Sequence, residues 1–148
     1  MKYDNIVKVS WLDVKTSTQD YADSSNNLNI QICQDQKCCT TGTLTGSFDK
    51  GATKKFSYWE IGECRSFELN SKEDIDVTFN QLTKDGWRGE LLSIATITKN
   101  TIAGKDAIVK YECPITTWLD VDSTEGYSSS FKTSCKVAST VDYDYYSD

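Results

Sequence analysis

Short segments in which apolar and polar residues alternate recur along the whole chain, and this alternation constrains the fold more than any other feature. Clear examples occur at residues 7–11, 28–32 and 75–79. Neighbouring side chains of a β-strand point to opposite faces, so such segments predict strands with one buried face. No segment repeats apolar residues every three or four positions over a helical length. Many short strands at this spacing predict an all-β protein, an antiparallel β-sandwich.

Further strand candidates and turn clusters complete the expected organisation. The segments 94–97, 108–111 and 131–137 are also rich in β-branched or apolar residues. Clusters of turn-forming residues separate the candidates at 23–27, 46–51, 84–86 and 103–106. The chain of 148 residues has the size of one domain, which we place at 1–140. The last eight residues, 141–148, are acidic and rich in tyrosine, which predicts a flexible tail.

Composition excludes several classes of function. The chain contains no histidine, which removes Ser-His-Asp and Cys-His catalytic arrangements and the common zinc-hydrolase ligand sets. It contains 16 basic and 22 acidic residues, a net charge of −6, which argues against binding to nucleic acid. No apolar run approaches transmembrane length, and no nucleophile motif frames a serine. A non-catalytic binding module therefore fits the composition better than an enzyme.

Six cysteines make the second informative pattern. They are Cys33, Cys38, Cys39, Cys64, Cys113 and Cys135. An even number in a small chain without a Cys-x-x-Cys pair predicts a secreted domain with up to three disulfides, and six buried thiols in a cytosolic protein are the alternative. Cys38 and Cys39 should not bridge each other, because a disulfide between neighbours is strained. Residues 34–37 look like a hairpin loop, so a local bridge from Cys33 to Cys38 or to Cys39 is expected.

Four segments in fixed order resemble the PLAT domain, the lipoxygenase homology domain. They are a strand, loop and strand over 9–32, the Phe-x-x-Gly-Ala-Thr-x-x-Phe segment 48–56, Asp-Gly-Trp and a strand over 85–98, and the segment 111–122 around Cys113-Pro114. The resemblance implies two packed four-stranded sheets that bind lipid surfaces or protein partners and perform no chemistry. It also implies that Trp87 and Trp118 pack between the sheets. The alternation itself places Trp11 in the core with Val7 and Val9.

The same resemblance argues against calcium binding by this chain. PLAT domains that bind calcium carry acids where this chain has Ser25 and Lys54. Calcium needs several oxygen ligands with carboxylate charge, so a tight site is not expected. Four other acids remain weak candidates for a site at one end of the sandwich: Asp20, Asp23, Asp35 and Asp85. No other cofactor is expected.

The segment 54–59 contains the candidate contact residues. Lys54, Lys55, Tyr58 and Trp59 combine positive charge with aromatic rings in a loop-like stretch, the pairing that a loop needs to touch a lipid headgroup layer. We therefore expect attachment to a lipid surface or to a protein partner through one end of the sandwich. A glycan-binding or receptor-interaction sandwich is the alternative function, because rings also suit sugars. A purely structural alternative is that the two rings cover one end of the fold.

Overall fold

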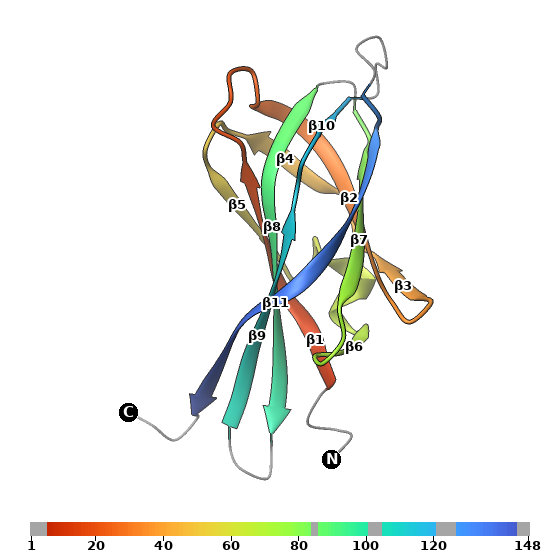
Figure 1. Cartoon of the computed structure of the whole chain (residues 1–148), viewed down its shortest axis with the longest axis vertical. Helices are drawn as coiled ribbons and strands as arrows, with labels where there is room; N and C mark the ends of the chain where they lie inside the picture. The colour runs from red at the N-terminus through yellow and green to blue at the C-terminus, as the bar shows by residue number, and fades with distance from the viewer. Residues whose placement is uncertain (1–5, 84–85, 101–104, 121–126, 145–148) are drawn as a thin grey trace.

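The computed structural model describes residues 6–83, 86–100, 105–120 and 127–144, and shows an all-β, antiparallel protein (Figure 1). Its elements, in chain order, are β1 (Ile6–Thr16), β2 (Ser24–Gln34), β3 (Lys37–Thr40), β4 (Leu44–Phe48), β5 (Thr53–Ser57), the 3-10 helix η2 (Gly62–Arg65), β6 (Glu68–Asn70), β7 (Ile75–Gln81), β8 (Trp87–Asn100), β9 (Lys105–Pro114), β10 (Trp118–Leu119) and β11 (Ser130–Asp144). In these ranges no helix is long and apolar enough to cross a membrane.

The strands form one continuous curled sheet instead of two separate four-stranded sheets. The hydrogen-bonded order is β3-β2-β7-β11-β9-β8-β1-β5, with β4 on β2, β6 on β1 and β10 on β8. Strand β11 makes the continuity possible because it is long: residues 130–135 pair with β7, and residues 136–144 pair with β9. In Figure 1 the upper part of β11 runs beside β7 and its lower part beside β9. The all-β prediction is confirmed, and the division into two sheets is not.

The core lies inside the curl and is filled by the predicted alternating residues. In β7 the buried residues are Ile75, Val77, Phe79 and Gln81, with half-buried residues between them. Trp87 is fully buried, and its Nε1–H donates to Thr16 Oγ1 at 3.0 Å. This bond satisfies the one polar group of the indole, which lets the ring occupy the core at little cost. The expectation for Trp87 is confirmed.

Trp11 and Trp118 depart from expectation. The pairing of β1 with β8 shifts between Val9 and Trp11, so Ser10 forms a β-bulge. A bulge adds one residue to a strand and reverses the alternation beyond it. Leu12 and Val14 therefore continue the buried face, and Trp11 lies half-buried on the outer face. Trp118 is also half-buried, while its neighbour Leu119 is the core residue of β10.

Several sequence boundaries also differ. Residues 46–48 of the expected turn 46–51 belong to β4, and residues 105–106 of the expected turn 103–106 begin β9. Residues 24–27, predicted as part of a turn, begin β2, because they pair with β4 over Ser24–Leu28. The asparagines that suggested a turn are used inside the sheet: Asn26 Nδ2 donates to Ser24 Oγ at 3.1 Å. At the other end, residues 141–144 of the expected tail continue β11 along β9. Residues 145–148 lie outside the described residues.

All six cysteines form disulfides in the structure. Cys33 pairs with Cys38 across the β2–β3 hairpin, which settles the local bridge that the sequence left open. Its two-residue turn, Asp35-Gln36, has φ values of 55° and 67°, as a tight hairpin requires. The other bridges are Cys39–Cys64 and Cys113–Cys135. Three such bridges are typical of proteins that fold in oxidising compartments.

Candidate functional site

The segment 58–67 leaves the sheet between two strands that share β1 as their neighbour. Ser57, the last residue of β5, pairs with Trp11, and Glu68, the first residue of β6, pairs with Lys8. Tyr58 turns the chain away from the sheet with φ 53°, a left-handed conformation uncommon for tyrosine. The segment therefore lies on the flank of the sheet, beside the middle of β1. The expected position at one end of a sandwich is wrong.

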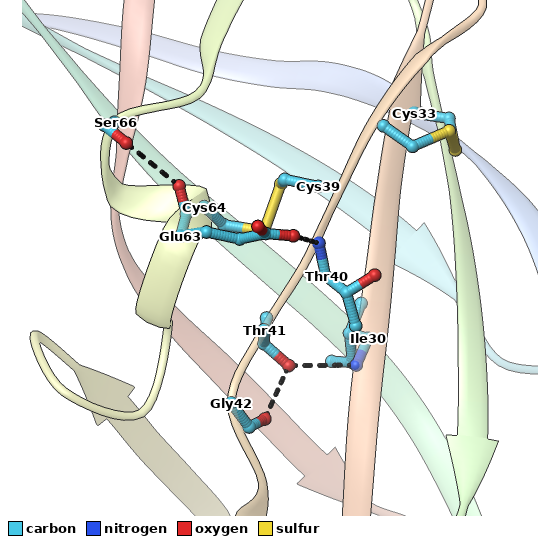
Figure 2. Close-up of a disulfide and its surroundings, with 10 residues drawn as sticks. Ile30, Cys33, Cys39, Thr40, Thr41, Gly42, Glu63, Cys64 and Ser66 are labelled. Carbon is cyan, nitrogen blue, oxygen red and sulfur yellow. Dashed lines mark hydrogen bonds between the residues drawn. A yellow bond between two sulfur atoms is a disulfide. The ribbon is translucent and has the colours of Figure 1, made fainter.

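Buried groups anchor this segment from behind. Ile61 and Cys64 are fully buried, and Cys64 is bonded to Cys39 of β3. Figure 2 shows this disulfide and, beside it, Glu63, whose Oε1 accepts a hydrogen bond from the Thr40 N–H at 2.8 Å. The inner side of the segment is thus fixed to the edge of the sheet.

Close backbone packing adds to this attachment. Gly62 adopts φ 54°, and a Cβ on it would lie 3.1 Å from the Gly42 nitrogen. A Cβ on Gly42 would in turn lie 3.1 Å from the Glu60 carbonyl oxygen. The two glycines therefore let two backbones meet where side chains would separate them. The turn has a fixed base, and its outer side chains are presented from it.

Two aromatic rings project outward from the turn. Trp59 is 80 % exposed and Tyr58 is 54 % exposed, although both are large and partly apolar. Their ring centroids lie 4.8 Å apart in an edge-to-face arrangement. The Arg65 guanidinium lies over the Tyr58 ring, 3.9 Å from its centroid. Tyr58 is thus held between Trp59 and Arg65, and Trp59 remains the most exposed ring of the turn.

The two candidate lysines do not act together. Lys54 and Lys55 lie in β5, so their side chains point to opposite faces of the sheet. Lys54 is half-buried, and its Nζ lies 5.7 Å from the Phe56 ring centroid and against Gly46. Lys55 is exposed on the outer face, where its Nζ lies 4.7 Å above the Trp11 ring. Only Lys55 therefore shares the outer face with the aromatic turn.

A groove of about 480 Å³ opens beside the two rings. It is lined by Lys8, Tyr58, Trp59, Gly62, Arg65 and Ser66, which include two cations and no carboxylate. Neither cation belongs to an ion pair within the part of the chain that the structure describes. In a protein with net charge −6, this groove is a local concentration of positive charge beside exposed rings.

A larger cleft of about 580 Å³ has the opposite charge. Its lining includes Asp35, Glu68 and Glu73, with Lys37 as the cation. Across the described ranges, no group of three or more histidine, cysteine or acidic residues could hold a metal ion. The lining of this cleft has neither the exposed rings nor the positive charge of the groove.

The four acids considered for calcium do not gather at one end. Asp23 directly precedes β2 and Asp35 directly follows it, so the whole 11-residue strand separates them, roughly 35 Å at the usual rise. Asp20 forms an exposed ion pair with Lys50, with 3.1 Å between carboxylate oxygen and Nζ. Asp85 lies outside the described residues. The expected gathering is therefore wrong for Asp35.

Sequence reasoning missed Lys8, Trp11 and Arg65 as members of this surface. Lys8 lies on the outer face by alternation between the buried Val7 and Val9, and the β1 bulge at Ser10 places Trp11 on that face as well. Arg65 reaches it through the fold of η2 over Tyr58. The sequence carried one signal for Arg65, its position next to Cys64. That signal has meaning only once the partner of Cys64 is known.

Comparison with known proteins places the fold but not the family. No family model and no curated protein matches the chain. Solved structures do match: the Delta413-417:GS variant of a lipoxygenase and its arachidonate complex, each with a TM-score of 0.55 and 14 % identity. A form of the same lipoxygenase with one further substitution matches equally well. The matches cover 86 % of this chain and 16 % of the lipoxygenase chain.

The region matched is the N-terminal PLAT domain of the lipoxygenase. This chain has the PLAT fold. The resemblance drawn from four sequence segments is thus supported at the level of architecture, and at 14 % identity it extends no further. The matched domain is a non-catalytic part of the lipoxygenase, and the described residues of this chain form a small all-β domain without a catalytic arrangement.

Proposed function

We propose that this chain is a non-catalytic PLAT-like module that attaches to a lipid surface through the Tyr58–Trp59 turn. The exposure of Trp59 at 80 %, on a turn fixed from behind by a disulfide, carries the proposal. A fixed turn loses little conformational freedom when its ring enters another phase, so more of the burial energy remains for binding. The cations Lys8, Lys55 and Arg65 on the same flank would attract lipid phosphates.

The rings supply enough energy for a reversible contact. Burying most of one tryptophan and half of one tyrosine removes roughly 200 Å² of surface from water. At 25 cal/mol per Å² this is at most about 5 kcal/mol. That energy suits a peripheral module that binds and releases, and it is far below that of a membrane-spanning segment.

The test is co-sedimentation with vesicles that contain phosphatidylcholine and phosphatidylglycerol. The double variant Tyr58→Ala, Trp59→Ala should lose most vesicle binding while its thermal unfolding hardly changes, because both rings are exposed. Tyr21→Ala is the matched control, since Tyr21 is 88 % exposed but lies beyond the far end of β1. If Tyr21→Ala loses binding and the double variant retains it, the lipid contact lies in the β1–β2 connection and the assignment fails. A partner protein would instead be indicated if no variant of the chain sediments with vesicles.

We also propose that attachment is independent of calcium and takes place outside the cytosol. Lys54 brings a cation against Gly46, in the segment where calcium-binding relatives carry an acid. The three disulfides favour an oxidising compartment. Vesicle binding that disappears with a chelator would refute the first proposal. Six free thiols in protein isolated from its natural source would refute the second.

A further inference from the structure

We propose that the groove between Arg65 and Lys8 binds the headgroup phosphate of an anionic phospholipid. This inference rests on the proposed attachment to lipid and specifies which lipid the module selects. The groove is lined by two cations and no carboxylate, on a protein whose overall charge would repel anions. A headgroup that keeps its net negative charge suits such a groove better than phosphatidylcholine, whose choline would meet the two cations.

The local contacts prepare Arg65 for this role. Its guanidinium lies over the Tyr58 ring at 3.9 Å, and stacking holds the group in place without neutralising its charge. The N–H donors at the edge of a stacked guanidinium remain free to bind an oxyanion, and arginine is the side chain that best matches phosphate oxygens. Ser66 also lines the groove, but its hydroxyl donates to the Glu63 carbonyl oxygen at 3.2 Å. The site therefore combines an oriented arginine donor with the second charge of Lys8.

Lys8 is the second cation, and the strand pairing shows which acid opposes it. Glu68 stands directly across from Lys8 in the β1–β6 pair, on an exposed position. No ion pair joins them among the described residues, so the lysine charge is weakened by this neighbour but not cancelled. Trp59 at the rim would enter the interface when the headgroup occupies the groove, which places phosphate and ring at compatible depths.

The first experiment measures affinity for phosphatidylcholine vesicles with and without phosphatidylglycerol. The wild-type chain should bind the mixed vesicles at least several-fold more tightly. Arg65→Gln and Lys8→Gln should each reduce affinity for the mixed vesicles roughly five-fold, a larger loss than either causes for pure phosphatidylcholine. Arg65→Lys should lose part of the preference, less than Arg65→Gln loses, because it keeps the charge but not the stacked, planar set of donors. Glu68→Gln should increase it.

Lys132→Gln is the matched control, because Lys132 is an exposed cation in the part of β11 that pairs with β7. It removes the same charge away from the groove and should change affinity less than two-fold. Equal losses in Lys132→Gln and Arg65→Gln would show that only net charge matters and would overturn the inference. Retention of the full lipid preference in both groove variants would overturn it as well. A melting temperature for each variant confirms that it is folded.

A soluble arm separates this inference from the proposed function. Glycerophosphoglycerol, the headgroup without its acyl chains, should shift the Arg65 Nε–H and Trp59 indole NMR signals of the wild-type chain, and the shift should vanish in Lys8→Gln. If the wild-type chain binds no vesicles but shows this shift, attachment to membranes fails and recognition of the headgroup stands. If inorganic phosphate shifts the signals equally and vesicles show no lipid preference, the groove is a free-phosphate site and the headgroup assignment fails.

Discussion

The Cys39–Cys64 disulfide should stabilise the fold and also position the contact turn. In the chain-entropy description, a disulfide stabilises a protein by restricting its unfolded chain, and the effect grows with the enclosed loop. The sequence separation of 25 gives about 3.5 kcal/mol for this bridge. The separation of 22 gives about 3.4 kcal/mol for Cys113–Cys135. The separation of 5 gives about 2.1 kcal/mol for Cys33–Cys38.

Paired Cys→Ala variants test these magnitudes by urea unfolding under oxidising conditions. The Cys39→Ala, Cys64→Ala variant should lose about 3.5 kcal/mol, close to the loss for the Cys113–Cys135 pair. The Cys33–Cys38 variant should lose clearly less. The reasoning is refuted if the three losses are equal, or if the shortest loop costs most.

Vesicle binding separates the positional role from stability. Removing Cys39–Cys64 frees η2 from β3, so Arg65 and the aromatic turn lose their fixed base and lipid affinity should fall several-fold. The Cys113–Cys135 disulfide joins β9 to β11, away from the turn. Its removal should cost nearly the same stability and leave lipid affinity unchanged. An equal fall in affinity for both variants would show that stability alone, and not position, controls binding.

Three further outcomes are expected. Trp87→Phe should lower the free energy of unfolding by about 2 to 3 kcal/mol in urea titrations, because it removes core volume and leaves Thr16 Oγ1 without the indole donor; a loss below about 0.5 kcal/mol would contradict this. Burial, with the charges of Asp74 and Glu73, raises the pKa of Tyr111 from 10.0 to about 12. As the pH rises, the Tyr111 hydroxyl therefore loses its proton first in the unfolded chain. The stability that the protonated hydroxyl contributes is present below pH 10 and is lost as the pH rises toward 12, a change of about 2 to 3 kcal/mol. Tyr111→Phe should show a smaller fall in stability over that window, and an unchanged slope would contradict the assignment. Calcium should leave the melting temperature of the chain unchanged relative to chelator, and a rise of several degrees would show a calcium site.

Local alternation was sufficient to predict the fold class and most long strands. Segments such as 28–32 and 75–79 carry their own evidence, because the two faces of a strand meet different environments and select different residues. The short strands β3, β4, β5 and β6 escaped prediction. Each has only three to five residues, and each exists because a longer strand offers it backbone hydrogen bonds. That partner is not encoded within the segment.

The candidate site divides in the same way. The sequence by itself singled out Tyr58 and Trp59, because two rings after two lysines form a local pattern, and the structure shows both rings exposed. It also placed Lys54 and Lys55 together, although β5 sends them to opposite faces. Side chains of neighbouring residues in a strand point to opposite faces of the sheet. The pairing of β5 with β1 therefore places Lys54 and Lys55 on different faces.

The sequence determined that this chain is an all-β domain with an even set of cysteines and one aromatic pair beside two lysines, and it left the exposure of those rings open. Only the tertiary structure decided that the sheet is continuous, that Cys64 pairs with Cys39, and that Lys8 and Arg65 share a groove. The physical reason is range. Alternation and turn chemistry act between residues a few positions apart, whereas the groove joins residues 57 positions apart through the pairing of β1 with β6 and a disulfide on η2. Such contacts depend on which strands meet, and the whole core selects that arrangement.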